Sequence, residues 1–325
     1  MILAGDVGGT KTHLALYELA ASVRAPVLER RLPSREYATI EALVHEFLAG
    51  VPARPSRTVL GVAGPVVEQQ VEATNLPWRI GATALSAELG GVPVLLINDL
   101  EATAWGLPLL DASEVETLHP GTPRPGNRAL IAAGTGLGEA LLIWDGKTWW
   151  PSASEGGHAD FAPRDALEDE LLQWLRGRYG RVSYERVLSG PGLADLYRFL
   201  AATGRETASR DVAARFETAG DPGAVVSTAA LDGSCARARL ALERFVSIYG
   251  AEAGNLALKA LAVDGVYVGG GIAPRILPLL RSGGFLEAVH DKGRLGPMLA
   301  RIPVSVLRDD RAALWGAARL ALASA

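Results

Sequence analysis

The amino-acid sequence predicts an α/β fold with mainly parallel, buried strands, and two patterns carry this prediction. Short apolar runs alternate with segments whose apolar residues recur at helical spacing, as expected when strands alternate with helices. A strand–glycine turn–strand pattern also occurs near the start and again about half a chain later. This repeat indicates a duplicated α/β unit with a cleft between the copies, although two unrelated hairpins would give the same pattern.

The first copy opens the chain, and a helix and two strands come after it. Ile40, Leu43 and Phe47 lie at helical spacing, and Gly50 with Pro52 ends that helix. We expect a strand at 2–4, a turn at 5–10, strands at 13–17, 58–63 and 93–97, and a helix at 38–49.

The second copy lies in the middle of the chain, and most of the sequence beyond it has helical periodicity. We expect strands at 130–133 and 140–144 around a turn at 134–138, helices at 165–179, 191–202 and 236–261, strands at 265–268 and 304–307, and a final helix at 310–320. Asp309 or Asp310 is expected to cap the final helix, because a carboxylate accepts hydrogen bonds from its first N–H groups.

Charge and composition narrow the classes of partner. The formal net charge is −4, so bulk charge gives no reason to bind nucleic acid or an anionic membrane. No apolar run approaches the roughly 20 residues of a membrane span. Cys235 is the only cysteine, which excludes an intramolecular disulfide and favours a reducing cytoplasm. The first residues lack the basic region of a signal peptide, so we expect a cytoplasmic protein.

Three glycine-rich turns are candidates for nucleotide binding. The segment from Gly5 to Thr12 is close to a Walker A loop, but its sixth position is Thr10 and not glycine, and it leads into a strand, so a P-loop is rejected. Its backbone N–H groups could still hold phosphate, with Asp6 orienting hydrated Mg²⁺; a plain hairpin is the alternative. The segment 134–138 offers a second phosphate turn. The segment 269–271 follows a strand, opens a predicted helix and leaves room for a ring or ribose.

Two polar segments are candidates for binding and catalysis. Asn98 and Asp99 follow a strand, where a carboxylate is either a helix N-cap or a catalytic base. Glu155 and His158 flank two glycines. The two side chains could bind the hydroxyl groups of a polyol, and an ordinary turn with a surface histidine is the alternative. The five histidines show no metal-ligand spacing, and with one cysteine a structural zinc site is improbable.

In combination, these motifs resemble bacterial ATP-dependent glucokinases of the hexokinase and actin-like ATPase superfamily. The resembling segments run in family order across nearly the whole chain, and SEGGH, ERVLSGPGL and ATNLPW are the more specific ones. They are GDVGGT (5–10), GVAGPV (61–66), ATNLPW (73–78), LINDL (96–100), GTGLG (134–138), SEGGHADFAP (154–163), SYERVLSGPGL (183–193) and GGGI (269–272).

The resemblance implies a role for each matching residue. Asp99 would be the general base for the sugar 6-hydroxyl. The sugar would bind to Asn98, Asp99, Glu155, His158 and Glu185. The nucleotide would bind to Gly5, Asp6, Val7, Gly8, Gly9, Thr10, Gly134, Thr135, Gly136, Gly269, Gly270 and Gly271. Asp6 would lie near Mg²⁺ through water.

The resemblance also implies a fold, partners and a reaction. Two actin-like, ribonuclease H-like α/β domains with mixed sheets would flank a hinged cleft. The smaller would comprise 1–109 plus 308–325 and the larger 110–307. The expected activity is transfer of the γ-phosphoryl group of ATP to glucose, the first step of glycolysis, by a homodimer that binds neither nucleic acid nor membrane.

Some alternatives and departures remain open. Another hexose or amino-sugar kinase, acting on mannose or N-acetylglucosamine, would fit the same motifs, as would a non-catalytic sugar sensor. A glycosidase would use Asp99 and Glu155 as its carboxylate pair. Residues 159–163 replace the cysteine-rich zinc motif of the repressor-like sugar kinases, which indicates the zinc-free group. Glu139 follows GTGLG where a small or apolar residue is expected, and would either face the phosphates or point outward.

Overall fold

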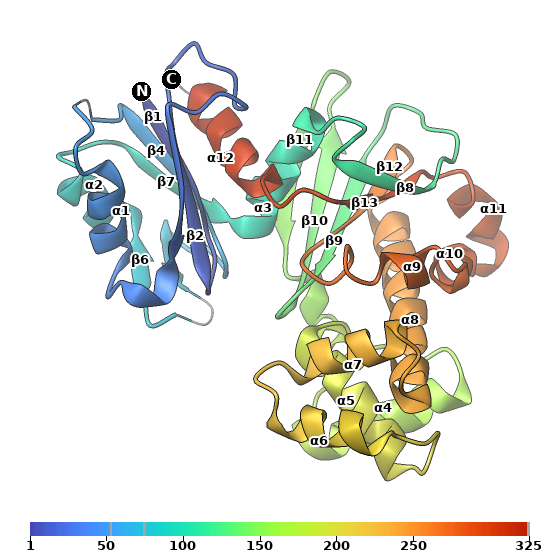
Figure 1. The fold of residues 1–325 in the computed structure, drawn as a ribbon. Coiled ribbons are helices and arrows are strands. Elements are labelled where there is room, and N and C mark those ends of the chain that lie inside the picture. The colour runs from blue at the N-terminus through green and yellow to red at the C-terminus, as the bar shows by residue number, and fades with distance from the viewer. Residues whose placement is uncertain (53, 74–75, 324–325) are drawn as a thin grey trace. The chain divides into compact units, whose positions relative to one another are not determined.

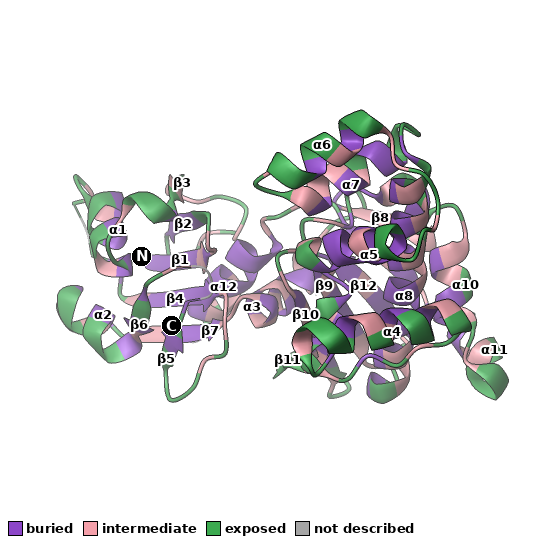
Figure 2. Cartoon of the chain, turned by 90° about the horizontal axis from the view of Figure 1, so that it is seen from below, coloured by how far each residue is buried: buried purple, intermediate pink, exposed green. Residues whose placement is uncertain are grey.

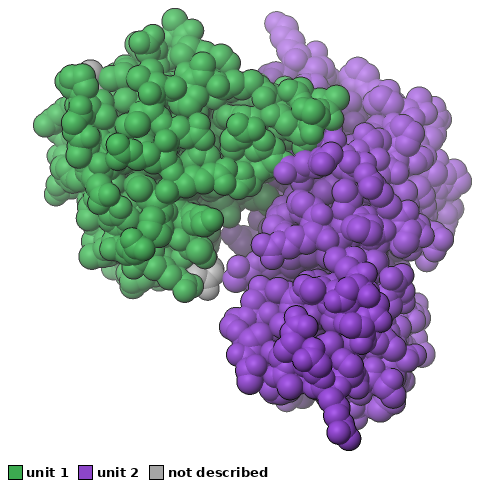
Figure 3. Space-filling model, viewed as in Figure 1, with its two compact units in different colours: residues 1–114, 150–153, 309–325 green, residues 115–149, 154–308 purple. Residues whose placement is uncertain are grey.

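The computed structural model describes residues 1–52, 54–73 and 76–323. Thr74 and Asn75 of the ATNLPW segment therefore lie outside the described residues. The chain divides into two compact units (Figures 1 and 3). Unit 1 comprises 1–114, 150–153 and 309–325, and unit 2 comprises 115–149 and 154–308. These units are defined by the contacts within them, whereas a domain is a part of the chain that folds by itself. The division into domains 1–109 plus 308–325 and 110–307 therefore stays a prediction.

Unit 1 is built on a five-stranded sheet in the order β3-β2-β1-β4-β7. The strands β3, β2 and β1 are antiparallel, whereas β1, β4 and β7 are parallel. The strands are β1 (Ile2–Val7), β2 (Lys11–Tyr17), β3 (Leu28–Pro33), β4 (Arg57–Val62) and β7 (Val94–Asn98), with β5 (Gln70–Glu72) and β6 (Arg79–Gly81) forming a separate pair. The helices are α1 (Ile40–Leu48), α2 (Ala82–Glu88), α3 (Asp99–Gly106) and α12 (Ala312–Ala323), with 3₁₀ turns η1 (Ser34–Glu36) and η2 (Leu107–Leu109).

Helices cover both faces of the unit 1 sheet (Figure 1). Side chains alternate between the two faces of a strand. Accordingly, Leu3 of β1 packs with Leu43 of α1, while Ile2 packs with Leu314 of α12. All four side chains are buried, so the sheet is the central layer of three.

Unit 2 contains a six-stranded sheet in the order β11-β10-β9-β12-β13-β8. The strands are β8 (Val115–His119), β9 (Arg128–Ala133), β10 (Leu137–Trp144), β11 (Trp149–Ser154), β12 (Gly265–Gly269) and β13 (Val304–Leu307). The helices are α4 (Ala166–Tyr179), α5 (Gly190–Ala202), α6 (Arg210–Thr218), α7 (Pro222–Leu231), α8 (Ala236–Ala260), α9 (Leu277–Leu280), α10 (Gly284–His290) and α11 (Gly296–Leu299), with 3₁₀ turns η3 (Gly156–His158), η4 (Tyr184–Arg186) and η5 (Gly293–Leu295).

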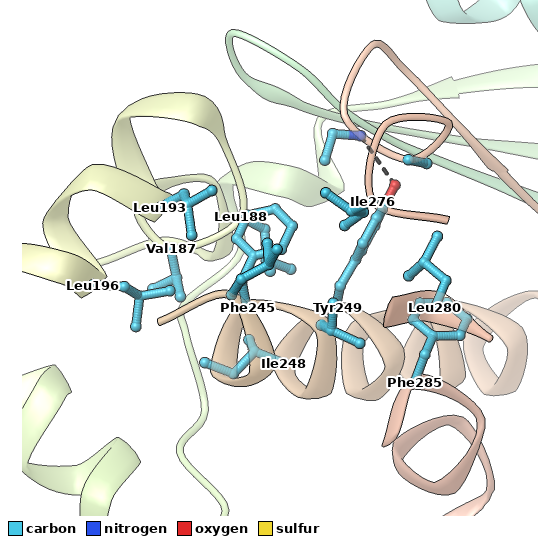
Figure 4. Close-up of a cluster of buried hydrophobic side chains, with 14 of the residues drawn as sticks. Val187, Leu188, Leu193, Leu196, Phe245, Ile248, Tyr249, Ile276, Leu280 and Phe285 are labelled. Atoms are coloured by element: carbon cyan, nitrogen blue, oxygen red, sulfur yellow. Dashed lines mark hydrogen bonds between the residues drawn. The ribbon is translucent and has the colours of Figure 1, made fainter. Parts of the chain in front are cut away.

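The 25-residue helix α8 is the centre of unit 2. It contacts β9 and β12 of the sheet, and α5, α7 and α10 pack around it. Figure 2 shows it buried along much of its length, and Figure 4 shows Phe245 and Tyr249 among the apolar side chains of α5 and α10. The hydroxyl of Tyr249 accepts a hydrogen bond from the N–H of Ala133, 3.1 Å away, at the end of β9. A core side chain therefore holds the strand end that enters the second glycine turn.

The fold confirms the mixed sheets implied by the resemblance and corrects three local expectations. The strands are not mainly parallel, because both copies of the repeated pattern are antiparallel hairpins. Residues 269–271 do not open a helix: Pro274 disfavours helical geometry in the residue before it, and α9 starts at Leu277. The final helix starts at Ala312, and Asp309 accepts a hydrogen bond from the N–H of Arg311.

Two glycines allow α3 and α12 to pack closely beside β4. A Cβ at Gly316 would overlap the carbonyl oxygen of Ala102, and one at Gly106 would overlap that of Ala312. Neither glycine has a positive φ. Both are required by the close approach of the helices, not by their own backbone conformation.

We therefore predict that Gly316→Ala destabilises the protein by about 1–3 kcal/mol, because the overpacked methyl group outweighs the gain in helix propensity. Gly177→Ala in α4 is the matched control: apart from the neighbouring backbone of α4 itself, no described atom lies within 4 Å of its Cβ position. That variant should be stabilised by about 0.5–1 kcal/mol. Thermal unfolding followed by circular dichroism measures both, and equal effects would contradict the close approach.

Candidate functional site

The first glycine hairpin in unit 1 is tighter than the sequence indicates. Gly5, Asp6 and Val7 belong to β1, and only residues 8–10 form the turn. The N–H of Gly8 donates to the carbonyl of Lys11 at 3.1 Å, and Gly8 and Gly9 remain partly exposed. The backbone of this turn can thus be approached by a ligand.

Ser34 of η1 fixes the turn. Its hydroxyl donates to the carbonyl of Gly8 at 2.7 Å, and its own N–H donates to the carbonyl of Thr10 at 3.1 Å. Thr12 lies 3.0 Å from the same hydroxyl. Sequence reasoning missed Ser34, and no local motif marks it, since the contact spans the whole of β2 and β3.

Asp6 is half-buried, and the carboxyl groups of Asp99 and Asp310 lie near its own. Burial, followed by the nearby charges of Asp99 and Asp310, raises its pKa to about 7, while Arg31 opposes the shift. A carboxylate in such a place is stabilised by a cation.

Asn98 and Asp99 stand at the carboxyl end of β7, near Asp6. Asn98 is the N-cap of α3: its Oδ1 accepts from the N–H groups of Leu100 and Glu101, and its Nδ2 donates to the carbonyl of Gly64 at 3.1 Å. Asp99 is the first residue of the helix and is half-buried. The cap is thus the asparagine, which leaves the aspartate as the candidate base.

The second and third glycine segments adjoin each other in unit 2. The strands β9 and β12 are parallel neighbours, with Ala132 paired to Gly269. Gly270 has φ +81° and lies so close to Ala133 that a Cβ would overlap its carbonyl oxygen. Across the hairpin turn, the N–H of Gly134 donates to the carbonyl of Gly136 at 2.8 Å.

The three predicted sugar ligands of unit 2 form one cluster. His158 Nε2 lies 3.9 Å from Glu155 Oε2, and His158 Nδ1 lies 4.0 Å from Glu185 Oε1. The side chains of Glu155 and His158 are 59% and 55% exposed, and that of Glu185 is 31% exposed. Two carboxylates and an imidazole therefore face solvent together, a set that can hydrogen-bond several hydroxyl groups.

Backbone contacts join this cluster to the second glycine turn. Glu185 Oε2 accepts from the N–H of Leu137 at 3.0 Å, in space left open by Gly136. A Cβ at Gly157 would overlap the carbonyl oxygen of Leu137. Arg181, which sequence reasoning missed, donates to the carbonyl of His158 at 2.7 Å. The polyol-binding and phosphate-binding candidates of unit 2 are thus parts of one surface.

Glu139 takes neither of the two expected orientations. It is 1% exposed, and its carboxyl group lies in the interior of unit 2 beside Glu252 of α8. The sequence does not reveal the pair, because the two residues are far apart along the chain and Glu252 lies in no recognisable motif.

The residues present fit a nucleotide phosphate and a hydrated cation. Apart from the adjoining residues of the chain, no described atom lies within 4 Å of the Cβ positions of Gly134 and Gly271, so the backbone is open there. Asp6 supplies one carboxylate, and Mg²⁺ is commonly held by one or two carboxylates with phosphates and waters. Among the described residues there is no group of three or more His, Cys, Asp or Glu side chains placed to hold a metal. The expectation of no zinc stays a prediction.

The predicted site residues thus form two groups. Unit 1 brings together the first turn, Asn98 and Asp99; unit 2 brings together the second and third turns with Glu155, His158 and Glu185. In the described part of the chain, no helix is both long and apolar enough to cross a bilayer.

Comparison with known proteins identifies the family of the chain. The sequence profile of the glucokinase family matches residues 3–324. A glucokinase from Nostoc sp. is 41% identical over 334 residues, which cover 98% of each chain.

Solved structures agree at the level of the fold. A glucokinase from an Antarctic psychrotroph superimposes with a TM-score of 0.83 at 31% identity over 98% of both chains. A glucokinase from Streptomyces griseus, solved with glucose and AMPPNP, shares the fold with a TM-score of 0.66 at 22% identity over 98% of both chains. The full-length match to the family profile and to close relatives shows that the chain belongs to the glucokinase family of hexose kinases.

Proposed function

We propose that the protein transfers the γ-phosphoryl group of ATP to the 6-hydroxyl of glucose, giving glucose 6-phosphate and ADP. The observation that carries this proposal is the exposed cluster of Glu155, His158 and Glu185, joined to the second glycine turn through Leu137. It supplies hydroxyl-binding groups and phosphate-binding backbone on one surface, which a phosphotransferase with a sugar acceptor requires.

Asp99 is proposed as the general base. Its carboxylate would accept the proton of the 6-hydroxyl as the oxygen attacks phosphorus, a role typically worth ~10²–10⁴-fold in rate. Asn98 would orient the sugar through the second hydrogen of Nδ2, because its Oδ1 already caps α3. Both residues stand where an α/β sheet commonly presents its ligands.

The sugar would bind to the unit 2 cluster through charge-assisted hydrogen bonds. A carboxylate accepts from hydroxyl groups, and such bonds are about twice as strong as neutral ones. A pocket built to pair each hydroxyl rejects analogues strongly, because buried groups left unpaired are costly.

The nucleotide would lie against the three glycine segments. Residues 5–10 and 134–136 would hold the phosphates, and residues 269–271 would lie against adenosine. Asp6 would bind Mg²⁺ through water, and the bound ion would neutralise charge on the phosphates. We also propose a cytoplasmic homodimer that needs no zinc; the single cysteine supports the location.

The first test is the choice of substrate. We expect phosphorylation of glucose with ATP and Mg²⁺ in a coupled assay, and slower turnover of mannose, fructose and N-acetylglucosamine. Equal rates would instead favour a broad hexose or amino-sugar kinase. Glucose binding without turnover with any nucleotide or polyphosphate donor would favour a sensor, and sugar release from a glycoside without ATP would favour a glycosidase.

A second prediction concerns the base. Asp99→Asn should lower kcat by ~10²-fold or more while glucose affinity stays within about tenfold, because the amide keeps the shape but cannot accept the proton. Steady-state kinetics, together with glucose titration of tryptophan fluorescence, separate the two effects. Near-normal turnover would remove Asp99 from this role.

A third prediction concerns the sugar cluster. Glu155→Gln should raise the glucose KM by about tenfold or more, since a hydrogen bond to a charged group contributes about 1.5–3 kcal/mol. Glu217→Gln, at an exposed position of α6, is the matched control and should leave the KM unchanged. An unchanged KM in Glu155→Gln would exclude Glu155 from sugar binding.

A further inference from the structure

Two buried carboxyl groups meet beneath the sugar cluster of unit 2. Glu139 lies on β10 and Glu252 on α8, and they are 1% and 0% exposed. Oε1 of Glu139 has no hydrogen-bond partner among the described residues, which is unusual for a buried oxygen. The roles proposed above for the glucokinase site use neither residue.

Glu139 supports the turn that carries Glu155 and His158. The tip of its side chain fills the place beside Gly156, where a Cβ would overlap Oε2. The next residue, Gly157, rests on the carbonyl of Leu137 at the start of β10. A movement of the Glu139 carboxyl group is therefore passed directly to the backbone between Glu155 and His158.

Glu252 is linked to the turn that carries Glu185. Its Oε2 accepts from Asn255 Nδ2 at 2.7 Å, and the same amide group lies 3.1 Å from the hydroxyl of Tyr184. Tyr184 precedes Glu185 in η4, and its N–H donates to the carbonyl of Ala159 at 2.9 Å. The pair thus lies between the two turns that hold the three sugar ligands.

The surroundings favour a single negative charge on the pair. Burial and the charge of Glu252 raise the pKa of the Glu139 carboxyl to about 8, and Lys259, whose Nζ lies 3.3 Å from Glu252 Oε1, partly opposes the rise. Protonated Glu139 can donate a hydrogen bond to Glu252. Among the described residues, Tyr184 of η4 and Lys292 before η5 interact with Glu252, and Tyr249 of α8 interacts with Glu139. Arg164, before α4, acts on Tyr184 and Lys292.

We propose that Glu139 and Glu252 share one proton and that this shared proton positions the two sugar-binding turns of unit 2. The inference rests on the proposed assignment of Glu155, His158 and Glu185 to the sugar. With the proton in place, a hydrogen bond joins the two carboxyl groups. When it is lost, two negative charges repel each other in a space closed to water, and the turns built on Gly156 and Tyr184 shift apart.

The test is the dependence of the glucose KM on pH. In the unmodified protein the KM should rise about tenfold between about pH 7 and about pH 9, because the binding-competent fraction falls as the proton dissociates. Glu139→Gln has the same shape and always carries a donor, so its KM should stay flat over this range. A rise that persists in this variant, or no rise in the unmodified protein, overturns the proposal.

Two further variants complete the kinetic test. Asp195→Asn is the matched control, because Asp195 is also buried in unit 2 but is paired with Arg198; it should keep the rise. Glu252→Gln removes the charge of the other member of the pair, so it should also abolish the rise of the glucose KM with pH. It takes the place of Glu139→Gln if that variant does not fold. A rise retained in Glu252→Gln would also overturn the proposal.

A second measurement separates this inference from the proposed function. A carboxyl group with a raised folded-state pKa contributes stability that is complete at low pH and is lost as pH rises toward that pKa. The melting temperature of Glu139→Gln should therefore increase relative to the unmodified protein from about pH 5 to about pH 8. A constant difference would overturn the shared proton, whether or not the protein phosphorylates glucose; failure of glucose phosphorylation alone would reject only the function.

Discussion

Close packing of backbone against the hairpin turn between β9 and β10 is the constraint on which unit 2 depends. The N–H of Gly190 donates to the carbonyl of Gly134, Gly270 rests on Ala133, and Gly157 rests on Leu137. The last two contacts require a residue without a side chain, because a Cβ at Gly270 or Gly157 would overlap a carbonyl oxygen. The segments that would hold phosphate, nucleoside and sugar are therefore fixed to one another through a few backbone atoms.

The same constraint explains why the glycines of the turns are not interchangeable. At Gly136, Gly157 and Gly270 a neighbouring atom occupies the place where a Cβ would lie, so these glycines serve close packing inside the protein. Gly134 and Gly271 have no described neighbour at the Cβ position, so they leave backbone open to a ligand. The glycines of these turns thus have two roles, close packing and access for a ligand, and only the contacts in the structure distinguish them.

Local chemistry let the sequence predict the hairpin positions and eight of the thirteen strands among the described residues, but not β3, β5, β6, β8 and β11. Its errors come from interactions that a window of neighbouring residues does not contain. The hairpins were visible in the repeated pattern, yet alternation of strands and helices favoured parallel pairing. Pro274 was also visible in the sequence. Its effect on the residue before it outweighed the pattern that predicted a helix directly after the third glycine turn. Ser34 and Tyr249 act across long separations, and no local pattern marks them.

Glu139 shows this limit most clearly. Alternation along a strand assigns a side chain to one of two faces, and the sequence therefore offered a choice between the phosphates and solvent. In an α/β unit a face of the sheet is covered by a helix, so the side chain that leaves the ligand surface enters the core. A protonated carboxyl group there needs a partner that accepts its hydrogen bond, and Glu252 on α8 is that partner. A residue that would repel phosphate if it faced the site can then support the site from beneath.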